Sequence, residues 1–362
     1  MADLELLLYL NRLSFLTSRE RIFLATKFES AATLRRATLY DLSLMVNRSL
    51  APKRRPSIQF EFDLRRDLRV LHSGELEVVS FFDPLYPPLL RQSWDPPLVL
   101  FCRGNRQLLA DDAPVSVVGT RRPDGGALKA TRILGAEIAR DGYTVVSGLA
   151  RGIDGAAHRG ALGHPGGRTV AVLGSGVDRL YPDCHRPLGR EILSRGGLLV
   201  SEFPPGTEAR KYRFPKRNRI IAGMSPLLWV IQAPEGSGAL ITAGHASSEN
   251  RDIVCHRAGF LPGRAGQGCR ALEEEGCGVY GSWSEYRAAQ QWPPYRPGLE
   301  FPDSIIKDWE IGVREKPEEE KDSEKARRRR RQRRAVKRET GEVFSGQQLL
   351  SIFTGEEEDL SG

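Results

Sequence analysis

The chain has 362 residues, 40% of them hydrophobic and 28% charged, which is ordinary for a globular protein and long enough for two domains and a tail. Its net charge of +8 is concentrated: residues 325–338 contain ten Lys or Arg, and without them 44 cations face 46 anions. No apolar run approaches the roughly 18–20 residues of a membrane span, and the acidic N-terminus, M-A-D-L-E-L-L-L, is unlike a basic secretory signal. We therefore expect a cytoplasmic protein with no membrane segment, in which any site for a polyanion is a local patch.

The first 75 residues predict a small, all-helical module. Apolar residues recur at three- and four-residue spacing, as on one face of a helix, in the segments 4–13, 19–28 and 38–46. Ser18 and Thr38 are predicted N-caps, because each stands at the N-terminal end of such a segment. The polar stretch A-P-K-R-R-P (51–56) is predicted to link this module to the rest of the chain.

Between residues 77 and 300, short β-rich runs alternate with helix-like segments. The runs are typical of strands buried on both faces: 115–119, 143–148, 169–174, 198–202, 227–232 and, as a sixth, 252–256. The helix-like segments between them are 126–141, 153–162, 185–195 and 215–224. This alternation predicts an α/β fold with a doubly wound, mostly parallel sheet.

Beyond residue 300 the apolar periodicity fades. An acidic block, K-P-E-E-E-K-D-S-E-K, is followed directly by a basic block, A-R-R-R-R-R-Q-R-R. Because such a composition cannot bury enough apolar surface to fold, residues 301–362 are predicted to form a charged, largely disordered tail.

The loops after the predicted strands are rich in Gly, Ser, Thr and Arg. In an open parallel sheet these loops lie at the carboxyl ends of the strands, where helix N-termini present backbone N–H groups to ligands. Small residues let a phosphate approach the backbone, and arginine binds it in a bidentate manner. The loops are 119–126, 147–158, 174–182, 210–219 and 234–243. They predict an anion-binding rim, in which R-K-Y-R-F-P-K-R-N-R (210–219) alone carries six cations.

Familiar catalytic and cofactor motifs do not fit these loops. G-S-G at 174–176 lacks the third glycine of a dinucleotide fingerprint, and the sequence has no G-x-x-x-x-G-K-[ST] phosphate loop. Ser147, Asp154 and His158 suggest a triad, but no nucleophile elbow surrounds the serine. A capping Asp154 and a hydrogen-bonded His158 are the preferred interpretation, and histidines beside cysteines lack metal-ligand spacing. We predict no catalytic residue, no cofactor and no metal site.

Several motifs occur together in an order that is typical of one family. They are G-T-R-R (119–122), S-G-L-A-R-G-I-D-G-A-A-H (147–158), V-L-G-S-G-V-D-R-L-Y-P (172–182), S-E-F-P-P-G (201–206), F-P-K-R-N-R-I-I-A-G (214–223) and G-A-L-I-T-A (238–243). With these motifs the chain resembles the DNA-processing protein A (DprA/Smf) family over roughly 78–260.

The resemblance implies an extended Rossmann-like domain at 77–300 that binds single-stranded DNA in a basic pocket, forms a homodimer and is not an enzyme. It implies a mediator that loads a RecA-type recombinase onto single strands, in natural transformation (competence) or DNA maintenance. The helices at 1–75 resemble the family's small SAM or helix-hairpin-helix-like module, without its glycine-bearing hairpin. The DNA- or phosphate-binding residues that the motifs imply are Gly119, Thr120, Arg121, Ser147, Gly148, Phe214, Lys216, Arg217, Asn218, Arg219 and Gly238.

The cations in these motifs carry the expected phosphate contacts. Arg121 is the strongest candidate, since it lies at the end of a strand, beside the Gly119 turn. Lys216, Arg217 and Arg219 lie in the first turns of a helix, where a cation is unfavourable unless an anion binds nearby. Successive helical residues point about 100° apart, so at least one of the three should face elsewhere.

Other positions carry more than one expectation. Asn218 is expected to brace loop backbone, whereas Phe214 either stacks on a base or anchors its loop in the core. Asp183 stands where the family often has a cation, and Asn250 stands where it has a glycine; asparagine tolerates the left-handed conformation that glycine adopts.

Two other functions compete with this interpretation. Rossmann-like nucleotide phosphoribohydrolases use a P-G-G-x-G-T-x-x-E loop; here the segment 234–242 places Thr242 where the carboxylate is needed. Alternatively, the arginine run 327–334 could act alone, as a charge-driven adaptor for RNA or duplex DNA.

Overall fold

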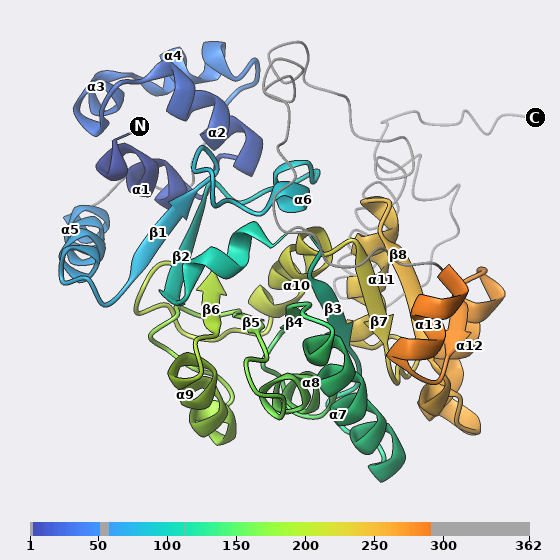
Figure 1. Ribbon diagram of the computed structural model, residues 1–362. Helices are drawn as coiled ribbons and strands as arrows, with labels where there is room; N and C mark the ends of the chain where they lie inside the picture. Colours follow the sequence, from blue (N-terminus) through green and yellow to red (C-terminus); the bar gives the residue numbers. More distant parts are fainter. Residues whose placement is uncertain (1–2, 51–57, 112, 291–362) are drawn as a thin grey trace, which may run out of the picture. The chain divides into compact units, whose positions relative to one another are not determined.

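The computed structural model describes residues 3–50, 58–111 and 113–290 (Figure 1). The predicted tail at 301–362, with the arginine run 327–334, and the predicted linker at 51–56 lie outside the described residues. Among the helices of the described ranges, none is both long and apolar enough to cross a membrane.

The N-terminal part of the chain is helical. It comprises α1 (Leu4–Arg12), α2 (Ser18–Lys27), α3 (Ala31–Arg36), α4 (Leu39–Met45) and α5 (Ile58–His72). Thr38 caps α4 as predicted, with its side chain accepting from the Asp41 backbone N–H. The prediction that Ser18 is a cap was wrong by one residue: Thr17 is the N-cap of α2, in a capping box with Glu20, and Ser18 is already helical.

A nine-stranded sheet organises the rest of the described chain. Its strands are β1 (Glu77–Ser80), β2 (Val99–Gly104), β3 (Val115–Val118), β4 (Val145–Ser147), β5 (Thr169–Val172), β6 (Leu198–Ser201), β7 (Leu227–Val230), β8 (Asp252–His256) and β9 (Gly278–Tyr280). In space they follow the order β1-β2-β6-β5-β4-β3-β7-β8-β9. The predicted α/β fold is confirmed, with the parallel strands β3 to β9 extended by β1 and β2, which pair antiparallel.

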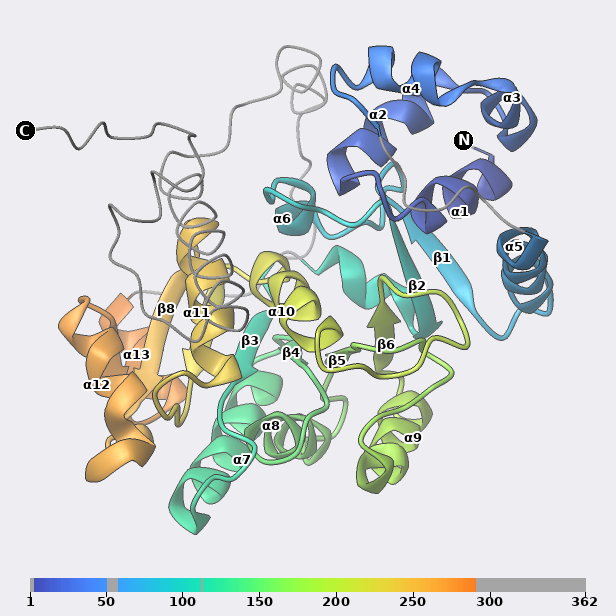
Figure 2. The same ribbon diagram turned by 180° about the vertical axis from the view of Figure 1, so that it is seen from behind.

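Helices cover both faces of this sheet (Figures 1 and 2). They are α6 (Pro88–Arg91), α7 (Gly125–Arg140), α8 (Ile153–Leu162), α9 (Arg186–Ser194), α10 (Arg213–Met224), α11 (Gly238–Ser248), α12 (Gln267–Glu274) and α13 (Trp283–Gln290). Short 3-10 turns are η1 (Arg106–Ala110), η2 (Asp183–His185), η3 (Arg257–Gly259) and η4 (Gly263–Gly266). The alternation of β3 shows the two faces: Val115 and Val117 pack with α7 and α8, whereas the Ser116 hydroxyl donates to the Ile221 carbonyl of α10 over 2.8 Å.

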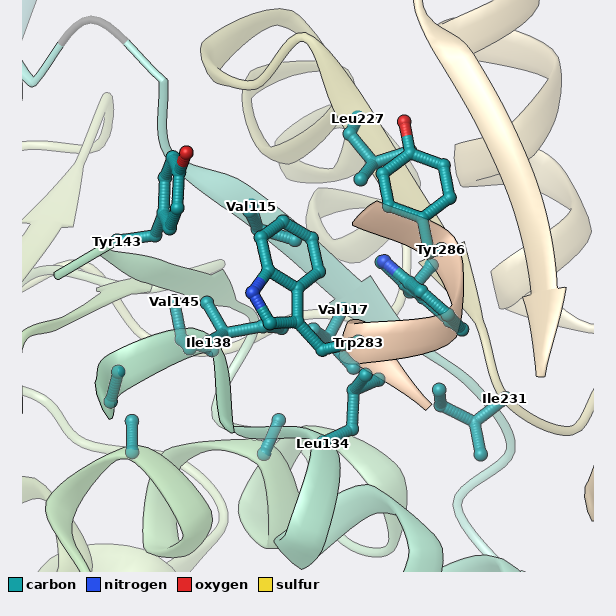
Figure 3. Close-up of a cluster of buried hydrophobic side chains, with 14 of the residues drawn as sticks. Val115, Val117, Leu134, Ile138, Tyr143, Val145, Leu227, Ile231, Trp283 and Tyr286 are labelled. Atoms are coloured by element: carbon teal, nitrogen blue, oxygen red, sulfur yellow. The ribbon is translucent and has the colours of Figure 1, made fainter. Parts of the chain in front are cut away.

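The core between the sheet and α7 is closed by the last described helix, α13 (Figure 3). The Trp283 ring stacks on Tyr286 at 5.7 Å and meets the edge of Tyr143 at 5.3 Å. Its indole N–H donates to Asp141 at the end of α7 over 3.0 Å, so the buried polar atom is satisfied.

Asn250 has φ 54°, so it takes the left-handed conformation expected of it.

Candidate nucleic-acid interface

The strand order reverses between β3 and β7. From β3 the chain winds outward through β4, β5 and β6, and it then returns to place β7 on the other side of β3. Such a switch point opens a crevice at the carboxyl ends of the strands. Here the two flanking loops are joined, since Thr120 N donates to the Gln232 carbonyl over 2.7 Å and Asp124 N to the Gln232 side chain over 3.2 Å. We call the loops 119–124, 148–152, 173–182, 202–212 and 231–237 the rim.

The loop after β3 is shaped by close contacts that only glycine allows. A Cβ on Gly119 would lie 2.5 Å from Ile153 at the start of α8. Gly152, with φ 77°, would place a Cβ 2.4 Å from the Thr120 carbonyl. The Thr120 hydroxyl accepts from Arg122 N over 3.2 Å, so its role in the structure is to hold the turn.

Arg121 is the exposed cation at the centre of the rim. Its side chain forms neither a hydrogen bond nor an ion pair with any other residue of the described chain. Its guanidinium carbon lies 5.2 Å from the centre of the Phe214 ring, within cation–π range. Arg121 therefore has no ion-pair partner among the described residues, although its charge also acts on the buried carboxylate of Asp154.

Phe214 is half-buried and forms part of an aromatic pair. A Cβ on Gly174 would lie 2.9 Å from the Phe214 ring, which shows how closely the ring packs on that loop. Its other aromatic neighbour is Tyr181, at 5.5 Å between ring centres, and Tyr181 is 47% exposed. The packing on Gly174 supports the anchoring role considered for Phe214. The more exposed ring of the pair is Tyr181, which the sequence analysis did not select as a site residue.

Arg217 lies beneath the rim rather than on its exposed side. Only 3% of the residue is exposed, and its guanidinium donates to the Val172 carbonyl over 2.6 Å. A Cβ on Gly148 would fall 1.9 Å from the same guanidinium, so this glycine leaves the space that Arg217 occupies. Burial lowers the pKa of Arg217 to about 10, while the nearby Asp154 opposes that change. The structure differs here from the expected phosphate contact, because the helix turns this cation inward.

Arg219 is largely buried, with 10% of its side chain exposed, in a cluster of charges. It is 2.5 Å from Glu202 and 3.0 Å from Asp95, and burial disfavours its charged form, but these carboxylates raise its pKa. Lys216 lies 3.2 Å from the same Glu202 and is 44% exposed. Of the three cations expected at this helix, only Lys216 is exposed enough to reach a ligand, and a carboxylate already holds it.

The remaining residues expected at the interface take part in hydrogen bonds to the protein backbone. Asn218 holds backbone, as expected, although at the start of helix α11 rather than in a loop: its amide donates to the Gly238 carbonyl over 3.2 Å. Thr242 donates to the same carbonyl over 3.1 Å and is buried. Gly238 is exposed at the start of α11, so its carbonyl is occupied while its α-carbon is open to solvent.

No catalytic triad forms around Ser147, a buried residue. The Ser147 hydroxyl donates to the Val117 carbonyl over 2.6 Å. His158 Nδ1 lies 2.7 Å from the Thr169 hydroxyl, and burial lowers the pKa of His158 to about 3, so the ring is neutral. Gly148 N donates to the Asp154 carboxylate, whose pKa is raised by burial. These groups therefore support the loops of the rim, and none of them is free to react.

Further exposed cations lie on the loops of the rim. Arg122 and Arg151 lie on the loops after β3 and β4, and Lys211 lies on the loop before α10. Within the described ranges, none of their side chains has an ion-pair partner. The sequence analysis could have included these three cations, since all of them fall inside the motifs and loops singled out above. The sequence alone did not show which cations lack an ion-pair partner.

Comparisons with known proteins bear on the family and the fold of this chain. A family model described as DNA recombination-mediator protein A matches residues 77–288. Protein Smf of Synechocystis sp. is 44% identical over 174 residues, which are 47% of this chain and 43% of that protein. DNA processing protein DprA of Bacillus subtilis is 34% identical over 226 residues, or 62% of this chain and 74% of that protein. The chain thus spans less than half of the Synechocystis relative.

Two solved structures share the fold. The X-ray structure of DNA processing protein A from Streptococcus pneumoniae superposes with a TM-score of 0.64 and 31% identity, over 80% of this chain and 98% of that one. A structure of DNA processing protein A from Helicobacter pylori, described for its single-stranded DNA binding mode, gives 0.53 and 24%, over 60% and 96%. Since the family model covers more than half of the chain and the sheet superposes on a solved member, this chain belongs to the DNA recombination-mediator protein A family.

Proposed function

We propose that the rim binds single-stranded DNA by contacting the phosphates of the DNA backbone. It does so without reading sequence and without catalysing a reaction. The observation that carries the proposal is Arg121, an exposed guanidinium at the switch point with no ion-pair partner among the described residues. An exposed cation without such a partner at the carboxyl end of a parallel sheet is suited to a phosphate. Arg122, Arg151 and Lys211 are exposed on the loops of the rim and offer several further phosphate contacts.

The aromatic pair supports single-stranded over duplex DNA. Base stacking on an exposed ring contributes about 1–3 kcal/mol per base and needs an unpaired base. Tyr181 provides such a ring, while Phe214 holds it and Arg121 together. The Helicobacter pylori protein, which shares the fold, is described as binding single-stranded DNA.

We further propose that the protein acts in the cytoplasm, as a homodimer, to load a RecA-type recombinase onto the bound strand. Family membership supports the role of a recombination mediator. Sedimentation of the purified protein tests the dimer. RecA filament assembly on strands coated with a single-strand-binding protein tests the loading; no acceleration by this protein would contradict it.

The binding experiment measures fluorescence anisotropy of labelled oligothymidine and of duplex DNA at several salt concentrations. Each single-strand phosphate contact contributes about −0.7 to the log–log salt slope, so four contacts predict about −2.8. Arg121→Ala should flatten the slope by about 0.7. Arg132→Ala, which removes an exposed cation from the middle of α7, is the matched control and should leave the slope unchanged.

A chain that ends at residue 301 separates the rim from the tail. The rim interpretation expects single-strand binding and the Arg121 effect to persist in this shorter chain. Loss of all binding would instead favour the charge-driven tail. Release of free base from nucleoside monophosphates would favour the phosphoribohydrolase alternative; the buried, hydrogen-bonded Thr242 argues against it.

A further inference from the structure

A cationic pocket extends from the rim along helix α9 and shares loop 173–182 with it. Its cavity has a volume of about 370 Å³ and is lined by Arg103, Asp178, Arg179, Leu180, Arg186, Arg190 and Leu193. Four guanidiniums thus surround one carboxylate. Of these residues, only 178–180 belong to the motifs through which the family was identified.

The charges of the pocket are only partly neutralised within the protein. Arg103 on β2 and Arg190 on α9 have no ion-pair partner in the described part of the chain. Arg179 is 3.9 Å from Asp178, and Arg186 is 2.8 Å from Asp183, but both pairs are largely exposed and therefore weak. Arg186 and Arg190 are also one helical turn apart, where like charges repel by about 0.2–0.5 kcal/mol.

The loop that carries Arg179 is held firmly in place. The Asp178 carboxylate accepts from Gly206 N, at 2.8 and 2.9 Å to its two oxygens. Leu180 packs directly on α9, since a Cβ on Gly189 would lie 2.7 Å from it. The pocket is therefore preformed, with arginines around it and two leucines, Leu180 and Leu193, as its apolar surface.

The same loop joins this pocket to the rim. Arg179 lines the pocket and Tyr181, two residues later, contacts Phe214 in the rim. Two residues span at most about 7 Å of chain, so one extended ligand can touch both. We propose that this α9 pocket is a second phosphate-binding subsite, which receives the DNA strand as it leaves the rim past Tyr181.

This proposal rests on the proposed function of the rim, and a ladder of oligothymidine lengths tests it with the full-length chain. Short oligomers fill the rim alone, and longer ones also reach the α9 pocket. The double variant Arg103→Ala/Arg190→Ala should bind short oligomers like the wild type. For long oligomers its log–log salt slope should flatten by about 1.4. If the counterion effect vanishes at 1 M salt, this change corresponds to about 25-fold weaker binding at 0.1 M salt.

The controls separate charge, folding and the rim itself. Arg36→Ala/Arg132→Ala removes two exposed cations from α3 and α7 and should change neither slope. Arg190 is exposed, so Arg190→Glu should leave thermal unfolding unchanged and should weaken long-oligomer binding more than Arg190→Ala does. Arg121→Ala should weaken short and long oligomers alike.

Each outcome decides between the two proposals. If Arg121→Ala weakens binding while the double variant matches its control at every length, the rim stands and the α9 subsite is overturned. If Arg121→Ala has no effect on short oligomers, the rim itself fails. Thymidine monophosphate is titrated separately. The DNA path would also be overturned if the double variant lost its binding of thymidine monophosphate but kept its affinity for long oligomers. The pocket would then be a site for a free nucleotide.

Discussion

Arg121, on the loop after β3, and Phe214, in the first turn of α10, are more than ninety residues apart in sequence, yet the guanidinium of one lies 5.2 Å from the ring centre of the other. Tyr181 adds a second, more exposed ring at 5.5 Å from Phe214. The proposed phosphate contact and the proposed stacking surface are thus adjacent, which would suit an extended single strand, because its phosphates and unpaired bases alternate.

Tyr181→Ala should weaken single-strand binding by about 1–3 kcal/mol, since it removes the exposed ring on which a base can stack. Stability should change by no more than about 0.5 kcal/mol, because the side chain is partly in solvent. Anisotropy and urea unfolding measure the two effects. Tyr181→Phe keeps the ring and should bind as the wild type does; equal losses in both variants would argue against stacking.

Gly148→Ala should destabilise the fold by about 1–3 kcal/mol, the usual cost of overpacking. The added methyl group would displace the Arg217 guanidinium from the Val172 carbonyl. Gly244→Ala is the matched control, because nothing lies within 4 Å of a Cβ there and the residue is inside α11. It should stabilise the protein by up to about 1 kcal/mol. Similar urea midpoints for the two variants would contradict the close packing of Arg217.

Glu202→Gln should cost about 3–5 kcal/mol of unfolding free energy, since it removes one of the carboxylates that neutralise the buried Arg219. Glu191→Gln breaks an exposed pair with Arg195, 3.4 Å long, and should cost about 0–1 kcal/mol. Both are measured by urea denaturation. A Glu202 variant as stable as the Glu191 variant would show that Arg219 finds enough compensation elsewhere.

His158 should make stability fall as the pH falls below 6.5. Burial lowers its folded-state pKa to about 3, and the positive charges of His185, Arg217 and Arg159 act in the same direction. Between the unfolded and folded pKa values the unfolded state binds the extra proton, so this group removes about 1.4 kcal/mol per pH unit. His158→Asn should show a flatter dependence between pH 6.5 and 5. Identical slopes in the two proteins would mean that His158 accepts a proton without unfolding.

The predicted strands and helices of the sheet were confirmed because they are decided locally. Runs such as V-S-V-V are buried on both faces and read as strands without knowledge of their neighbours. β1 and β2 were missed, because β2 pairs with the much later β6 and its pattern is not distinctive on its own. β9 has only three residues, none of them fully buried, and so gives little signal.

The residues of the interface were harder to predict, because charge in a sequence does not reveal direction. Lys216, Arg217 and Arg219 look equivalent in the motif, and the structure makes one exposed and two buried. A signal for Arg217 existed: with Ile220, Ile221 and Met224, all buried, it has the i, i+3, i+4, i+7 spacing of one helix face. For Arg219 no such signal was available, because its partners come from distant loops.

Gly148, Asp154 and Arg217 share one small space under the rim, and this has an evolutionary consequence. A larger residue at 148 excludes the guanidinium, and a shorter residue at 217 removes the cation that most lowers the pKa of the Asp154 carboxyl. Substitution at one position therefore selects for substitution at the others, and related sequences should change these three together or keep all of them. Lys216, half-exposed and beside a carboxylate that Arg219 already satisfies, should instead vary independently.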